Sequence, residues 1–79
     1  MIYEKFTFEV KKFISEKAGI DSSLIQEDTL IIESGYVDSL ILVELIIFIE
    51  NLTGNSIDID DFKVSKFSTI KSIYKNYGN

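Results

Sequence analysis

The stretch Leu40–Ile49 is the most apolar part of this 79-residue chain, and Glu44 is its only charged residue. It is too short to span a bilayer, which takes about 20 apolar residues. Asp38 and Ser39 can each cap a helix, because the side-chain oxygen of either can accept a free backbone N–H. Gly54 is a suitable stop. We therefore expect a helix that begins at Asp38 or Ser39 and ends just before Gly54.

This expected helix carries apolar residues on two opposite sides. At about 100° per residue, its core stripe comprises Leu42, Leu45, Ile46, Ile49 and Leu52. Nearly opposite lie Leu40, Glu44, Ile47 and Asn51. Either the other helices cover this one all round, or Leu40 and Ile47 form a partly exposed docking strip. Full coverage is hard to achieve in so small a chain, and exposed apolar patches usually mark contact sites, so we favour the docking strip.

Two further helices follow from apolar spacing. The first spans about residues 3–17 and presents on one face Ile2, Phe6, Val10, Phe13 and Ile14. The last is expected to be capped by Ser68 and to carry Ile70, Ile73, Tyr74 and Tyr77.

The segments between these helices are read from their turn and acidic residues. Residues 20–37 form a long connection, with a short turn capped near Asp21 and an apolar triplet, Leu30, Ile31 and Ile32, held in the core. A short third helix that carries Phe62 is expected to start within an acidic group, Asp58, Asp60 and Asp61. The sequence thus predicts an all-α fold, a small four-helix bundle of three longer helices and one short one, in a single domain of residues 1–79.

Composition excludes several functions. The net charge is −5 and lysine supplies all the positive charge, which argues against nucleic acid and favours a basic patch on a partner protein. The absence of Cys excludes disulfides and thiolate metal sites, and no other metal site is expected. The acidic group at residues 58–61 lacks the glycine and distal glutamate of a calcium loop. The N-terminus lacks the order of a signal peptide, so a cytoplasmic location is the default expectation.

The chain also lacks histidine, which leaves no base to activate a serine for hydrolysis. We therefore expect no catalytic residue and no enzyme activity. Ser39, at the start of the apolar helix, is the natural place to attach something that the protein carries.

The pattern Asp38-Ser39-Leu40, followed by Glu44-Leu45, resembles the acyl carrier proteins and the related peptidyl carrier domains. The resemblance covers essentially the whole chain, from the first helix and long loop through the acidic segment to the final helix. Asp-Ser alone is an ordinary helix cap. The combination with Glu44-Leu45, the length, the acidity and the order of elements is much more specific.

The resemblance implies that Ser39 bears 4′-phosphopantetheine, taken from coenzyme A by a phosphopantetheinyl transferase. The distal thiol would then hold an acyl or aminoacyl group as a thioester, so the chain itself needs no cysteine. Asp38 would help the transferase to recognise the site. Leu40, Glu44 and Ile47 would form the helix face that partners read.

The resemblance also implies further partners and a monomeric carrier with no membrane span. An adenylate-forming ligase or an acyltransferase would load the cargo, and a downstream synthase or transferase would receive it. Some positions depart from the fatty-acid type: the spacing from Gly35 to Asp38 is one residue longer, Ile41 and Ile47 make the helix face more apolar, and Asp58 stands where proline is frequent. These departures indicate a freestanding, specialised carrier. The alternative is an unmodified interaction module of the same fold, in which Asp38 and Ser39 merely cap a helix.

Overall fold

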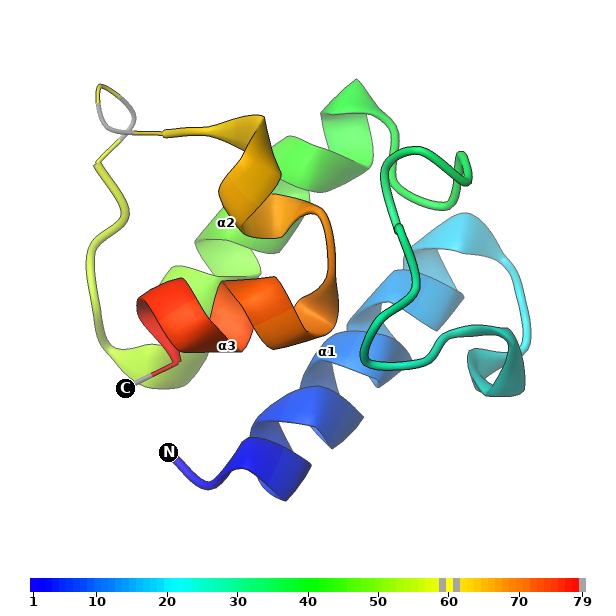
Figure 1. The fold of residues 1–79 in the computed structure, drawn as a ribbon, viewed down its shortest axis with the longest axis horizontal. Helices are drawn as coiled ribbons and strands as arrows, with labels where there is room; N and C mark the ends of the chain where they lie inside the picture. Colours follow the sequence, from blue (N-terminus) through cyan, green and yellow to red (C-terminus); the bar gives the residue numbers. More distant parts are fainter. Residues whose placement is uncertain (59, 61, 79) are drawn as a thin grey trace.

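The computed structural model describes residues 1–58, 60 and 62–78, and these contain three α-helices and no strand (Figure 1). The α-helices are α1 (Tyr3–Ala18), α2 (Ser39–Thr53) and α3 (Ile70–Tyr77). Two short 3-10 helices lie between them, η1 (Ser22–Leu24) and η3 (Val64–Phe67). The predicted all-α helical bundle is confirmed.

The ends of α1 and α2 agree with the predicted boundaries, and both helices stop at glycine. Gly19 and Gly54 have φ angles of 69° and 77°, in the left-handed region that glycine enters without steric cost. Their backbone N–H groups donate to the carbonyls of Ser15 and Glu50, and so satisfy two of the free acceptors at the helix ends.

The start of α3 differs from the prediction by one residue. Thr69, not Ser68, is the cap: its backbone is extended, and its hydroxyl oxygen accepts from the backbone N–H of Ser72 at 3.0 Å. Ser68 has helical backbone angles and donates its hydroxyl to the carbonyl of Ser65 at 3.0 Å. A cap needs extended backbone, which only Thr69 provides.

The short helix expected in the acidic segment can be followed only in part, because Ile59 and Asp61 lie outside the described residues. Asp58 Oδ1 accepts from the backbone N–H of Asp60 at 2.9 Å. The short helix that the structure describes in this region is η3, which begins after Phe62.

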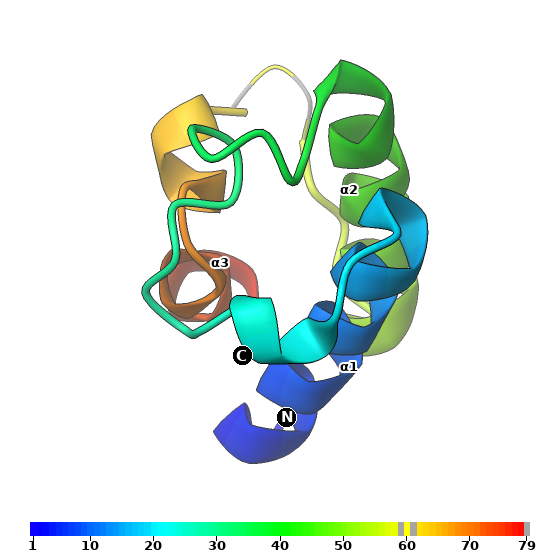
Figure 2. The ribbon, with the colours of Figure 1, turned by 90° about the vertical axis from the view of Figure 1, so that its right-hand side faces the viewer.

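The core lies where α1 contacts both α2 and α3. Figure 2 shows α1 and α2 on one side of the molecule, α3 and η3 on the other, and the α1–α2 connection between them. Helical residues that are fully buried include Phe6, Val10, Ile14, Leu45, Ile49, Phe67, Ile70 and Ile73. The two ends of the chain also meet, since the Tyr74 hydroxyl donates to the Met1 carbonyl at 2.7 Å (Figure 1).

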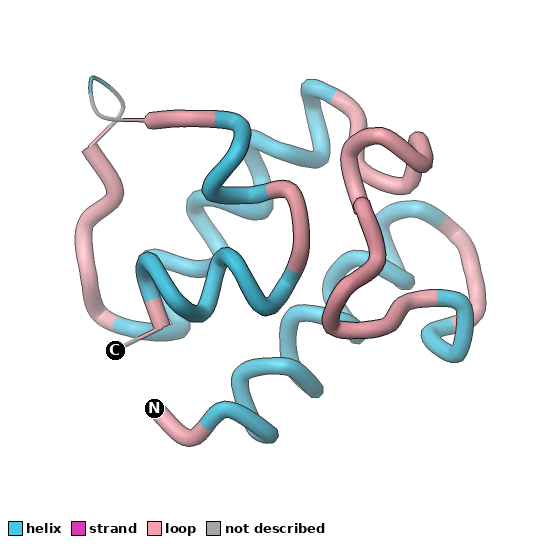
Figure 3. The backbone as a smooth tube through the Cα atoms, in the orientation of Figure 1, coloured by secondary structure: helices cyan, strands magenta, loops and turns pink. Residues whose placement is uncertain are grey.

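The long connection between α1 and α2 has almost no regular structure (Figure 3), yet hydrogen bonds fix it to α3 and to the turn before α3. The backbone N–H of Ile31 donates to the Ser68 carbonyl, and that of Lys71 donates to the Glu27 carbonyl, both at 3.0 Å. Of the predicted core triplet, Ile31 is fully buried and Ile32 is half-buried, whereas Leu30 is 46% exposed. The prediction was wrong for Leu30, because loop backbone turns neighbouring side chains in different directions.

The short turn near Asp21 forms as predicted. Asp21 Oδ1 accepts from the backbone N–H of Ser23 at 2.9 Å, and this hydrogen bond lowers the pKa of the Asp21 carboxyl. The turn buries Ile25 and leaves Leu24 exposed.

We predict that the two neighbours Ile31 and Leu30 differ sharply when each is cut to alanine. Ile31→Ala removes a fully buried side chain and should lower the free energy of unfolding by about 2–5 kcal/mol. Leu30→Ala should cost less than about 1 kcal/mol, because that side chain is already half in water. Urea unfolding followed by circular dichroism measures both. Equal losses would show that the loop is not fixed through Ile31.

Candidate functional site

Asp38 caps α2. Its backbone is extended, and its Oδ1 accepts from the backbone N–H of Ile41 at 2.9 Å, while its carbonyl accepts the first helical bond from Leu42 at 2.8 Å. The sequence left open whether Asp38 or Ser39 caps this helix, and the structure assigns the role to Asp38. Ser39 is therefore the first residue of the helix proper.

The Ser39 side chain is exposed, and its hydroxyl makes no hydrogen bond with any residue that the structure describes. It stabilises neither the helix start nor the loop before it. The chain has no histidine to serve as a base for it, and Oδ1 of the adjacent Asp38 accepts the backbone N–H of Ile41. What remains is a primary alcohol in water at the tip of a helix, open to an outside enzyme.

The backbone that leads to Ser39 is well anchored. Val37 is 1% exposed, and its backbone N–H donates to the carbonyl of Ile31 at 2.9 Å. Gly35 turns the chain before it with a φ of 89°. Tyr36 packs against the core, which agrees with a covering role for this side chain. The serine thus stands on a fixed support although a loop precedes it.

One face of α2 next to the serine is apolar and open to water. Leu40 is 69% exposed, Val43 54% and Ile47 52%, and we call these three residues the docking strip. The exposure of Leu40 and Ile47 agrees with the sequence prediction. Val43 was missed, although it lies four residues from both Ser39 and Ile47, a spacing that places it on the same side of the helix.

The opposite side of α2 faces the core as predicted. Leu45, Ile46 and Ile49 are buried, and Leu42 and Leu52 are half-buried.

Glu44 lies at the edge of α2 that faces α1. Its Oε2 is 2.7 Å from Nζ of Lys17, and its side chain is 35% exposed. The residues of the predicted partner face therefore lie in two different environments. Leu40 and Ile47 are exposed to water, while Glu44 forms an ion pair with the neighbouring helix.

A shallow groove between α1 and α2 continues the docking strip. It is lined by Phe13, Glu44, Ile47, Phe48 and Asn51. The rings of Phe13 and Phe48 stack with centroids 4.4 Å apart and planes at 16°. The spacing of aromatic residues along each helix did not reveal this pair, because it joins two helices.

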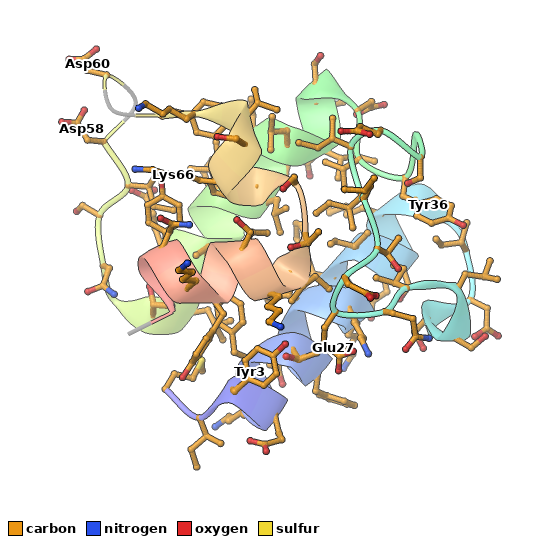
Figure 4. The ribbon with its side chains drawn as sticks, in the orientation of Figure 1. Tyr3, Glu27, Tyr36, Asp58, Asp60 and Lys66 are labelled. Carbon is orange, nitrogen blue, oxygen red and sulfur yellow. The ribbon has the colours of Figure 1, made fainter. Side chains whose placement is uncertain are left out.

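The described residues contain no group of three or more His, Cys, Asp or Glu side chains that could hold a metal ion. Asp58 and Asp60 are at the outer edge of the molecule, and both side chains point away from it (Figure 4). In the part of the chain that the structure describes, no helix combines the length and apolar character needed to cross a membrane.

Sequence comparison finds relatives that match most of this chain. The chain is 37% identical over 70 residues to an acyl carrier protein of Thermotoga maritima, which covers 89% of this chain and 84% of that protein. It is 36% identical over 72 residues to acyl carrier proteins of Rickettsia massiliae and Rickettsia felis, which covers 91% of this chain and 81% of each relative. No family model matches the chain.

We predict that two neighbouring alanine substitutions differ in their effect on stability. Asp38→Ala removes the cap and should lower the free energy of unfolding by about 1 kcal/mol. Ser39→Ala should change it by less than about 0.5 kcal/mol, because the hydroxyl holds nothing in place. Urea titrations of both variants against the wild type measure these values. A larger loss for Ser39→Ala than for Asp38→Ala would mean that the serine is the structural cap.

Proposed function

The chain belongs to the acyl carrier protein family, and we propose that Ser39 bears 4′-phosphopantetheine as the point where this protein holds its cargo. The observation that supports this most is the exposed Ser39 hydroxyl, which has no hydrogen-bond partner among the described residues. When bound, the prosthetic group supplies the thiol that holds an acyl or aminoacyl group as a thioester.

The residues at the start of α2 fit such a group. In the attachment, Ser39 Oγ would pass its proton to a base of the transferase and form a P–O bond to the pantetheine-bearing phosphorus of coenzyme A. The pyrophosphate bond of coenzyme A would break, and adenosine 3′,5′-bisphosphate would leave. The resulting phosphodiester would lie at the positive end of the α2 dipole, which favours negative charge. The Asp38 carboxylate opposes that charge, but its hydrogen bond to Ile41 keeps it in a fixed position that a transferase can read.

A carrier protein is not itself an enzyme, and its chemistry is done by partner enzymes. We propose a phosphopantetheinyl transferase as the first partner. An adenylate-forming ligase or an acyltransferase would load the cargo, and a synthase or transferase would accept it. Leu40, Glu44 and Ile47 form the proposed partner face, to which we add Val43 because of its exposure.

We further propose that residues 1–79 act as one monomeric carrier unit in the cytoplasm. The longer spacing from Gly35 to Asp38 and the apolar face of α2 support a specialised pathway over housekeeping fatty-acid synthesis.

Modification of Ser39 is directly testable by mass. Co-expression with a broad-specificity phosphopantetheinyl transferase should give a single mass increase equal to one 4′-phosphopantetheine group. Ser39→Ala should abolish the increase and leave the helical circular dichroism unchanged.

The chain offers a matched control for this experiment. Asp21-Ser22 repeats the dipeptide Asp38-Ser39, and Asp21 likewise caps a helix, the three-residue η1, with Ser22 exposed. Ser22→Ala should be modified like the wild type. A wild-type protein that stays unmodified with several such transferases would contradict the proposal and favour an unmodified interaction module.

A further inference from the structure

We propose that enzymes acting at Ser39 dock on α2 through apolar contact, so that the partner presents an apolar surface to this helix and not a basic patch. This inference rests on the proposed function and specifies the chemistry of its partners. Three observations carry it: the engagement of both α2 carboxylates, the exposure of the docking strip, and the groove beside that strip.

Both carboxylates of α2 already have partners within the molecule. Glu44 and Glu50 are the only acidic residues in Ser39–Thr53. Glu44 is paired with Lys17 at 2.7 Å. Glu50 Oε2 accepts from the backbone N–H of Ile57 at 2.8 Å, which fixes the chain after α2. A basic partner would have to compete with these contacts.

The rest of the exposed face offers no charge beyond the cap. The docking strip of Leu40, Val43 and Ile47 is more than half exposed at each residue, and its exposed neighbour Asn51 is neutral. Burial of such side chains is favourable in proportion to the apolar area removed from water. Interface centres typically are apolar and poor in charge, with polar groups at the rim.

The groove shapes the expected contact. It begins at Ile47 and has Phe48 and Phe13 along it, with Glu44 and Asn51 among its lining residues. Since Ile47 belongs to both the strip and the groove, the two form one continuous apolar surface that starts beside Ser39. A protruding aliphatic or aromatic side chain of the partner fits this surface.

The net charge of −5 affects the approach of the partner rather than the docked contact. The exposed acidic residues among those described all lie outside α2, and they are Glu4, Glu16, Asp21, Asp28, Glu33, Asp38, Asp58 and Asp60. Charges at such positions speed the approach of a basic protein. Asp38, the cap of α2, and Glu16, which lines a pocket with Phe13 and Phe48, border the docking surface, and the others lie outside the docking strip and its groove.

Steady-state kinetics of modification test this inference. The measured quantity is the KM of a broad-specificity phosphopantetheinyl transferase for the unmodified carrier, at saturating coenzyme A. Val43→Ser and Ile47→Ser should each raise KM about fivefold to tenfold, with kcat changed less. Glu50→Gln should leave KM within twofold, since it keeps the shape of the side chain and removes only its charge.

Phe8→Ser is the matched control. Phe8 is 64% exposed on α1 and lies beside Ser22 and Lys11, away from the groove. Phe8→Ser removes exposed apolar area as the strip variants do, but away from the docking strip, so KM should stay within twofold. Circular dichroism and urea unfolding confirm that every variant is folded.

The inference is overturned if either strip variant keeps its KM within twofold, if Glu50→Gln raises KM fivefold or more, or if Phe8→Ser raises it as much as the strip variants do. None of these results touches the proposed function, which fails only if Ser39 is not modified at all.

Discussion

The carboxylate of Asp38 sets the register of α2, and the position of Ser39 depends on it. By accepting the backbone N–H of Ile41, Asp38 fixes which residue begins the helix. The next hydroxyl along the chain is thereby left exposed and without a hydrogen bond among the described residues. The cap and the proposed attachment site are thus adjacent residues: Asp38 holds the backbone, and the Ser39 hydroxyl is exposed.

The chain contains the same division a second time, at Asp21 and Ser22. Asp21 caps η1, and Ser22 is exposed at its first position. What differs is the surface that follows. η1 is three residues long, whereas α2 continues for 15 residues and presents Leu40, Val43 and Ile47 to water. The extended apolar face of α2 therefore distinguishes Ser39, the proposed attachment site, from Ser22.

Local patterns in the sequence predicted the features that local forces determine. Periodicity placed α1 and α2 and separated the core side of α2 from its exposed side. Val43 was missed although its local spacing places it beside Ile47, whereas other features that escaped prediction depend on contacts between distant segments. Thr69, and not Ser68, caps α3, and the carbonyl of Ser68 accepts a hydrogen bond from the backbone N–H of Ile31. The engagement of Glu50 with the backbone of Ile57 is of the same kind.

Fragmentation of the modified protein by tandem mass spectrometry tests most directly whether the Ser39 oxygen bears the prosthetic group. We predict that the added mass of 4′-phosphopantetheine is found on Ser39 alone, with Ser22 and the other serines unmodified. Added mass on any other residue would contradict it.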